Sequence, residues 1–176
     1  MKNAILIAGL ATVMCVQAQA AEIDAGVGIS IESDDSTIYI PIDIGDSIRI
    51  EPGVRYSETE IGSQLKADVL DLSVGVFKLL PIRESIRLYF GGRLAYVQAE
   101  IEQDYSDDVF DAKSEEDGYR ISPTLGFEYQ VTERFSVGGE AEWFYLDMDR
   151  DDGLDVSGVE QKEQGTETRV LFRFKF

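Results

Sequence analysis

Apolar and polar residues alternate with a period of two through most of the sequence after residue 21, and this pattern limits the chain to extended strands. Successive side chains of a strand point to opposite faces, so strict alternation gives each face its own chemistry. Ile38, Ile40, Ile42 and Ile44, for example, share one face of their segment, and no segment keeps a helical period. The alternating segments are 23–31, 38–44, 48–57, 70–77, 86–96, 119–129, 135–145 and 167–176. After the fifth segment the phase slips near Val97, Ala99 and Ile101, and a β-bulge is expected there.

Consecutive strands without helices form either a closed barrel or a sandwich. Several segments match the roughly 9–11 tilted residues with which a β-strand crosses a bilayer. The links at 45–47, 79–85 and 131–134 are short, whereas those near 103–117 and 147–165 are long and acidic. Short turns on one rim and long loops on the other are typical of an outer-membrane barrel, and an even strand number puts both termini at the short-turn, periplasmic rim. We therefore predict an all-β fold, an eight-stranded antiparallel up-and-down transmembrane β-barrel.

The first residues have the organisation of a secretory signal peptide. Lys2 gives a positive start, residues 4–16 are mostly apolar, and Ala18-Gln19-Ala20 is a cleavage site of the A-x-A kind. Cys15 is the only cysteine and lies inside the apolar stretch, so we expect a mature chain without a disulfide. No later segment approaches the roughly 18 apolar residues of a membrane-spanning helix. The predicted division is a signal peptide at 1–20 and a barrel at 21–176.

The polar faces of the segments carry many long charged side chains, whose signs balance. An eight-stranded barrel has an interior that side chains just fill, and an unpaired charge there is costly to desolvate. We therefore predict an ion-pair network in the lumen, made by Arg49, Glu51, Arg55, Arg87, Arg93, Arg120, Glu128, Glu140, Glu142, Arg169 and Arg173. The same faces also carry Asp24, Asp43, Asp71, Glu167 and Lys175, so cations and anions are equal in number.

Aromatic residues gather near both ends of the opposite, apolar faces. Two bands of amphipathic rings are expected at the two interfaces of a membrane. We predict an aromatic girdle of Tyr56, Tyr96, Tyr119, Tyr129, Trp143 and Tyr145. The alternative is a soluble barrel or sandwich whose core holds the same rings.

Composition excludes several classes of function. Asp and Glu outnumber Lys and Arg by 34 to 16, which argues against a nucleic-acid partner because phosphates need a cationic face. The chain has no histidine, so Ser-His-Asp and Cys-His sites are excluded and a zinc site is disfavoured. A carboxylate-dependent envelope enzyme that uses Glu140 and Glu142 remains an alternative, although a structural ion pair is the simpler interpretation. We expect no enzyme and no cofactor.

The signal peptide, the eight amphipathic strands and the ending Arg169-Val170-Leu171-Phe172-Arg173-Phe174-Lys175-Phe176 together resemble the small Gram-negative outer-membrane barrels of the OmpA/OmpX type. In that superfamily, aromatic residues at alternate positions before a terminal Phe are a signal for the barrel-assembly machinery. The resemblance therefore implies such a signal in Phe172, Phe174 and Phe176. It also implies a monomer surrounded by outer-membrane lipid and lipopolysaccharide.

The long acidic links are the remaining candidates for function. We expect a non-enzymatic role in envelope integrity or surface interaction through these loops, with an OmpW-like conduit for small solutes as the alternative, its pocket lined by Tyr39, Phe77, Phe144 and Leu146. Residues 147–153 resemble a calcium loop, but the glycine falls one position late and Gly158 stands where a bidentate Glu is required. An EF-hand is therefore rejected. Weak binding of divalent cations remains a hypothesis for Asp147, Asp149 and Asp151.

Overall fold

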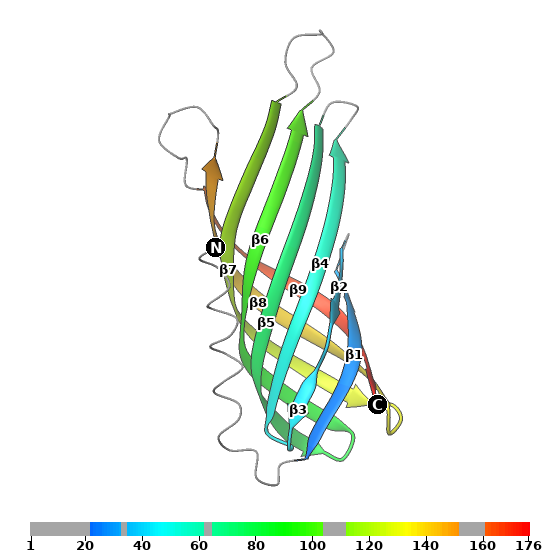
Figure 1. The fold of residues 1–176 in the computed structure, drawn as a ribbon. Helices are drawn as coiled ribbons and strands as arrows, with labels where there is room; N and C mark the ends of the chain where they lie inside the picture. Colours follow the sequence, from blue (N-terminus) through cyan, green and yellow to red (C-terminus); the bar gives the residue numbers. More distant parts are fainter. Residues whose placement is uncertain (1–21, 33–34, 62–64, 104–111, 152–160) are drawn as a thin grey trace.

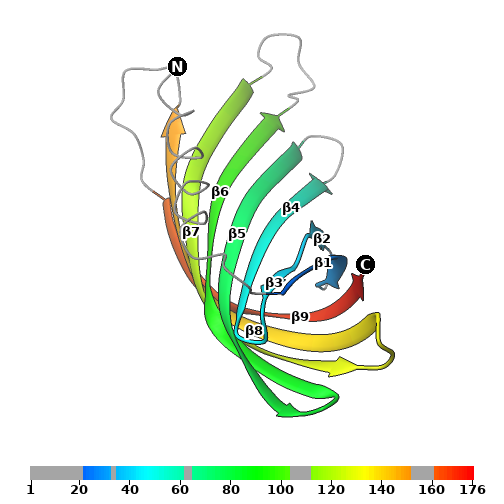
Figure 2. The same ribbon diagram turned by 60° about the horizontal axis from the view of Figure 1, so that its bottom comes forward.

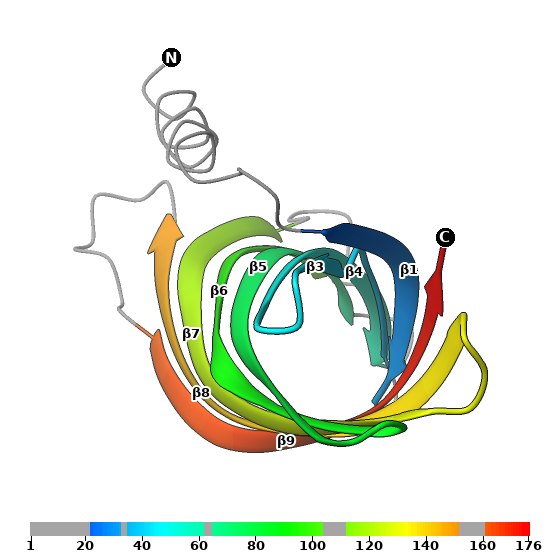
Figure 3. The ribbon, with the colours of Figure 1, turned by 90° about the horizontal axis from the view of Figure 1, so that it is seen from below.

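The protein is one antiparallel sheet rolled into a closed barrel (Figures 1 and 3). The computed structural model describes residues 22–32, 35–61, 65–103, 112–151 and 161–176, so the predicted signal peptide lies outside the described residues. Among the described residues, no helix is long and apolar enough to cross a membrane. The strands are β1 (Ile23–Ile31), β2 (Ser36–Tyr39), β3 (Ile42–Ile44), β4 (Ile48–Ile61), β5 (Leu65–Arg83), β6 (Ile86–Gln103), β7 (Ala112–Gln130), β8 (Phe135–Asp151) and β9 (Gln161–Lys175).

Two short strands, β2 and β3, together form one strand of the barrel. Both pair with β1 on one side and with β4 on the other. The break between them falls at Ile40 and Pro41, where Pro41 has no N–H to donate to the ladder. The backbone oxygen of Pro41 still accepts a hydrogen bond from the Gly26 nitrogen at 3.0 Å, and the Ile40 nitrogen donates to Pro52 at 2.9 Å. The nine labelled strands therefore make an eight-stranded barrel, which confirms the predicted fold class.

The barrel closes between its first and last strands. β1 runs antiparallel to β9 in a continuous register from Gly26 opposite Lys175 to Ile31 opposite Val170. From β4 to β9 each strand pairs with the next along the chain, which is an up-and-down topology. The tight turn predicted at 45–47 is present, and Gly45 has a φ of 57°, the left-handed region that glycine enters without a steric penalty.

Several predicted loops are wrong in their extent, because many of their residues belong to strands. The link predicted at 79–85 shrinks to the turn at 84–85, and much of 103–117 and 147–165 belongs to β7, β8 and β9. The phase slip expected near Val97 is also wrong, since the register of β6 with both neighbours is unbroken from Ala95 to Gln103. What changes there is the chemistry of the two faces, as described below, while the backbone stays regular.

Burial follows the alternation and settles which face is inside. The outward face exposes large apolar side chains, among them Leu125 at 61% and Ile121 at 56% of their surface, whereas Arg49 and Glu51 on the inward face are fully buried. A soluble barrel would bury its apolar face and leave the charges in water. The observed arrangement is inverted, as expected for a barrel that lies in lipid.

Candidate functional site: the charged interior of the barrel

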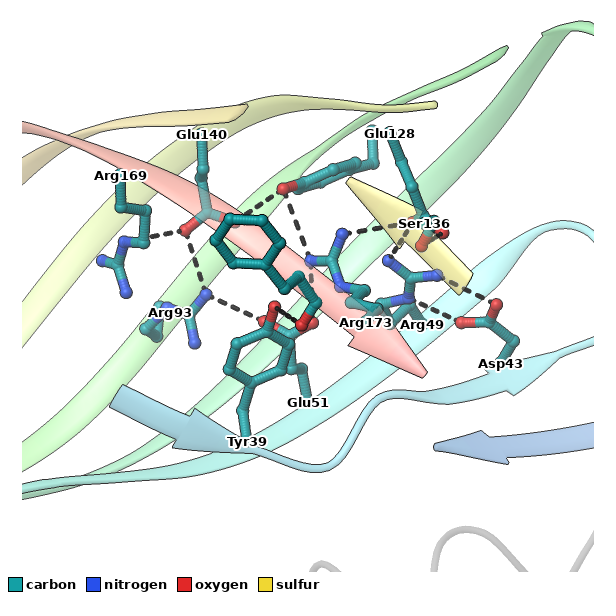
Figure 4. A network of polar contacts seen from close by, with 12 residues as sticks. Tyr39, Asp43, Arg49, Glu51, Arg93, Glu128, Ser136, Glu140, Arg169 and Arg173 are labelled. Atoms are coloured by element: carbon teal, nitrogen blue, oxygen red, sulfur yellow. Dashed lines mark hydrogen bonds and ion pairs between the residues drawn. The ribbon is translucent and has the colours of Figure 1, made fainter. Parts of the chain in front are cut away.

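The interior begins, on the side of the short turns, with a group centred on Arg49 of β4 (Figure 4). Its guanidinium donates from Nε and Nη2 to both carboxylate oxygens of Asp43, at 2.6 and 3.0 Å, and from Nη1 to Glu128 at 2.7 Å. In such a bidentate contact, two N–H groups of the planar guanidinium donate to the two oxygens of one carboxylate. Asp43 comes from β3 and Glu128 from β7, so this group connects opposite walls of the barrel.

Glu128 is the most heavily bonded carboxylate of this group. It accepts hydrogen bonds from Arg49 at 2.7 Å, Arg87 at 3.0 Å, Arg173 at 3.1 Å and the Ser136 hydroxyl at 2.7 Å. These partners come from β4, β6, β9 and β8. A buried carboxylate is tolerated only when its lone pairs are satisfied in this way.

The middle of the interior is organised around Arg173 and Arg93. Arg173 Nη2 donates to Glu51 at 3.0 Å, and Arg93 Nη2 donates to the other oxygen of Glu51 at 3.0 Å and to Glu140 at 3.1 Å. Glu140 also accepts from the Tyr89 hydroxyl at 2.9 Å. Each carboxylate thus bridges strands that are far apart in the sequence.

The last layer, nearer the long loops, joins Glu142 to Arg120 at 2.7 Å and to Arg169 at 2.5 Å. Arg120 also contacts Glu167. Glu32, which follows β1, contacts Arg55 at 3.3 Å and Arg169 at 3.1 Å. Sequence reasoning missed Glu32, because it follows the last alternating position of its segment and was assigned to a link.

Carboxylate oxygens of Glu32, Glu142 and Glu167 lie within 4.8 Å of one another, which is close enough to hold a metal ion. Each of these carboxylates, however, already contacts an arginine of the same layer. The guanidinium groups of Arg120 and Arg169 therefore provide the positive charge that a cation would supply, and the arrangement is one of ion pairs.

Aromatic rings fill the space between the charged layers. Tyr39, Phe77, Leu79, Tyr89 and Leu171 form one buried cluster. The Arg173 guanidinium lies 5.3 Å from the ring centre of Tyr39 and 5.1 Å from that of Tyr89, within the range of cation–π attraction.

Two glycines of the wall make room for these rings. A Cβ on Gly28 would collide with the Tyr39 ring, and a Cβ on Gly126 would collide with the Tyr89 ring. Glycine at these positions lets each ring approach the backbone closely and occupy the lumen.

Free space in the ion-pair layer nearer the long loops is very small. A cavity of about 10 Å³ lies among Arg55, Arg93, Arg120, Arg169 and neighbouring residues, which is at most the room that one water needs. Of the residues expected to line a pocket, Tyr39 and Phe77 belong to the buried cluster, and the Arg120 guanidinium lies 4.5 Å from the ring centre of Phe144. These three side chains therefore pack among other side chains of the interior.

The structure places all eleven residues of the predicted network in this interior, each in at least one ion pair. Lys175 contacts Asp43 at 3.3 Å and the half-exposed Asp24 at 3.8 Å, at the rim. The predicted girdle residues all lie on the outward face, five of them well exposed and Tyr96 partly covered. Phe174 and Phe176 also point outward at the end of β9, whereas Phe172 is half-buried.

The hypothesis of divalent binding at Asp147, Asp149 and Asp151 stays a prediction. Asp147 is half-buried in β8, whereas the side chains of Asp149 and Asp151 lie outside the described residues.

Sequence reasoning also missed a second, apolar cluster inside the barrel, towards the long loops. Ala95, Val97 and Met148 are buried there, with Val69, Ala99 and Leu146 packed against them. The available signal was the run of apolar residues at Val97, Ala99 and Ile101, which the sequence analysis assigns to a slip of phase.

The fold and interior define a class of protein: a closed eight-stranded barrel with an apolar exterior and a charged, filled lumen. Solved structures with this fold include Neisserial surface protein A, with a TM-score of 0.59 and 14% identity over 88% of this chain and 94% of that chain. A major outer membrane protein from Thermus thermophilus matches with a TM-score of 0.54 and 12% identity over 88% and 99% of the two chains. The protein thus shares its fold with small outer-membrane barrels.

A scan against protein-family models finds no match to the sequence, and a search of curated proteins finds no relative.

Proposed function

We propose that the protein is a non-enzymatic, integral barrel of the Gram-negative outer membrane, with both termini on the periplasmic side. The exposed apolar exterior supports a lipid environment, and the shared fold with outer-membrane proteins supports this particular membrane. The short turns at 45–47, 84–85 and 131–134 lie at the same rim as the end of β9 (Figure 1), which supports the orientation.

One observation carries the proposal: buried ion pairs and aromatic rings fill the lumen. Glu128 alone accepts four hydrogen bonds from four strands, and the cavity in the upper ion-pair layer holds about 10 Å³. A filled lumen leaves the outer surface and the long-loop end as the places where the protein can act. We therefore place its function there, in envelope integrity or in contact with molecules at the cell surface.

The same observation disfavours the two alternatives. A conduit needs an open path, whereas ion pairs and aromatic rings fill the interior of the described barrel, as is usual for eight strands. A carboxylate-dependent enzyme needs a cleft that admits substrate, but Glu140 and Glu142 are buried and hydrogen-bonded to Tyr89, Arg93 and Arg120. Both residues are components of the wall-to-wall network.

The experiment that tests the location is cell fractionation combined with a heat-modifiability gel. We expect the protein in the outer-membrane fraction, with a migration that changes on boiling because a folded barrel resists unfolding by detergent. A mature chain that stays folded and monomeric in buffer without detergent would overturn the proposal.

The experiment that tests the filled lumen is reconstitution into vesicles. We expect conductance and uptake of small solutes at the background level of protein-free vesicles. Reproducible uptake that requires the folded protein would favour the conduit instead. For the enzyme, hydrolysis of an envelope lipid or sugar that is lost in Glu140→Gln would contradict the proposal.

Binding at the surface needs its own test. Variants that lack the acidic residues within 104–111 or 152–160 should keep the heat-modifiable fold but lose binding to whichever surface ligand the wild-type protein retains. Unchanged binding in both variants would remove these segments from the proposal.

A further inference from the structure

Apolar runs of one constant length mark the outward faces of β6, β7 and β8. The runs extend from Ile86 to Tyr96, from Tyr119 to Tyr129 and from Phe135 to Tyr145, and each matches the roughly 9–11 tilted residues that span a bilayer. All three end in a tyrosine on the side of the long loops. The strands themselves contain 18, 19 and 17 residues, so every one of them continues well past that tyrosine.

The tyrosines at this level have the geometry of interfacial residues. Tyr56 of β4 donates from its hydroxyl to Asp68 at 3.1 Å, and Tyr96 donates to Asp117 at 3.3 Å. Asp68 and Asp117 both lie nearer the long loops than the tyrosines that donate to them. Each tyrosine ring therefore stays beside the apolar residues of the outward face, while its hydroxyl points towards the charged residues near the long loops. An amphipathic ring at a membrane interface is oriented in this way.

Beyond the tyrosines the outward face becomes acidic. Glu58, Asp68, Glu100 and Glu115 lie directly opposite one another across β4, β5, β6 and β7, and Lys66 contacts Glu58 at 3.0 Å and Asp68 at 3.5 Å. Four carboxylates and one ammonium group on a lipid-facing surface would be costly, because charges lose their hydration in hydrocarbon. This row of charges therefore points to an aqueous surrounding.

The inward face changes in the opposite sense at the same level. Below the tyrosines it carries the ion-pair network, whereas from their level upward it carries the buried apolar cluster of Ala95, Val97 and Met148, with Glu116 of β7 as a buried charged residue beside it. A mainly apolar inner face with a polar outer face is the pattern of a sheet in water. This second change is independent of the acidic row, because it concerns the other side of the same strands.

We propose that the hydrocarbon of the outer leaflet ends at Tyr56, Tyr96, Tyr119 and Tyr145, and that the wall beyond them stands in water as a sheet with its own apolar inner cluster. β4, β5, β6 and β7 visibly rise beyond β1 and β2 (Figures 1 and 2). With a rise of about 3.3 Å per residue and a tilt near 45°, six or seven residues reach about 15 Å past the hydrocarbon. The lipid-binding surface is thus restricted to the apolar runs, and this inference rests on the proposed membrane location.

Single-cysteine variants test this boundary. The only cysteine of the sequence, Cys15, lies in the predicted signal peptide, so the mature chain offers a background free of thiols. Leu94→Cys and Gln98→Cys form one pair on the outward face of β6, and Ile121→Cys and Asp117→Cys form the other on β7. Each would carry a nitroxide label in phosphatidylcholine vesicles, with heat modifiability as the check of folding.

The measurement is the collision rate of the label with oxygen, which concentrates in lipid, and with a water-soluble nickel chelate. We expect oxygen to dominate at Leu94 and Ile121, and the nickel chelate to dominate at Gln98 and Asp117. Dominance of oxygen at all four positions would place the boundary higher and overturn this inference while leaving the membrane location intact. Dominance of the nickel chelate at all four would instead refute the membrane location itself.

Discussion

Replacing Arg173 with Met tests whether the interior network holds the barrel together. Arg173 is 2% exposed and donates to Glu128 at 3.1 Å and to Glu51 at 3.0 Å, and its guanidinium lies over two tyrosine rings. Arg173→Met keeps much of the side-chain length but removes the charge and all of its donors. Glu51 then has only Arg93 as a hydrogen-bonded partner among those described.

The expected magnitude follows from these contacts. A hydrogen bond to a charged group contributes about 1.5–3 kcal/mol, and a desolvated cation–π contact about 2 kcal/mol. Glu128 retains Arg49, Arg87 and Ser136, which offsets part of the loss. We therefore expect the free energy of unfolding to fall by about 3–5 kcal/mol, the usual cost of removing one partner of a buried ion pair.

The assay is a urea titration of the protein folded in phospholipid vesicles, followed by tryptophan fluorescence of Trp143. Arg134→Met is the matched control, because Arg134 lies in an exposed turn and should change the free energy of unfolding by less than about 0.5 kcal/mol. The double variant Arg173→Met, Glu51→Gln should show a coupling energy of about 0.5–3 kcal/mol with respect to the single variants. A loss below about 1 kcal/mol for Arg173→Met, with no coupling to Glu51, would refute the reasoning.

Three further predictions follow from the two faces of the wall. Val76→Arg, on the lipid side opposite the middle of the 86–96 run, should destabilise the barrel by about 2–4 kcal/mol in a vesicle unfolding titration, whereas Gln98→Arg, beyond the tyrosines, should have almost no effect; equal effects would contradict the placement of the two residues. Gly126→Val should cost about 1–3 kcal/mol in the same titration, because the new side chain would overlap the Tyr89 ring. Gly92→Ala is the control, because a Cβ there makes only ordinary contacts. A neutral Gly126→Val would mean that the Tyr89 ring can move away without cost. Deletion of Phe176 should lower the amount of heat-modifiable protein in outer membranes of cells, measured by immunoblot, and undiminished levels would count against an assembly signal.

Alternation predicted the membrane-spanning part of the wall well. Tyr119 and Tyr129, for instance, were assigned to the lipid side from sequence, and both are about half exposed or more on that face. The assignment succeeds because the direction of a side chain in a strand depends only on its position along the strand. The same reasoning failed above the tyrosines, where Val97 and Ala99 point inward although they are apolar. The rule that apolar residues face outward holds only where lipid surrounds the barrel.

The partners within the interior were not predictable in the same way. Sequence reasoning identified Arg49 and Glu128 as lumenal, but it could not pair them, because they are 79 positions apart. Arg173 and Glu51, which are 122 positions apart, are likewise brought together only by closure of the sheet. Glu32 was missed altogether, since its inward orientation depends on how the chain leaves β1.

The sequence by itself determined the strands, their number and the face on which each side chain of the membrane-spanning wall lies, because these are local properties of an alternating backbone. Tertiary structure decided which charges meet, where the strands end and at which level the two faces exchange their chemistry. Those features depend on the register and tilt with which the sheet closes, and residues on opposite walls acquire a common height only after closure.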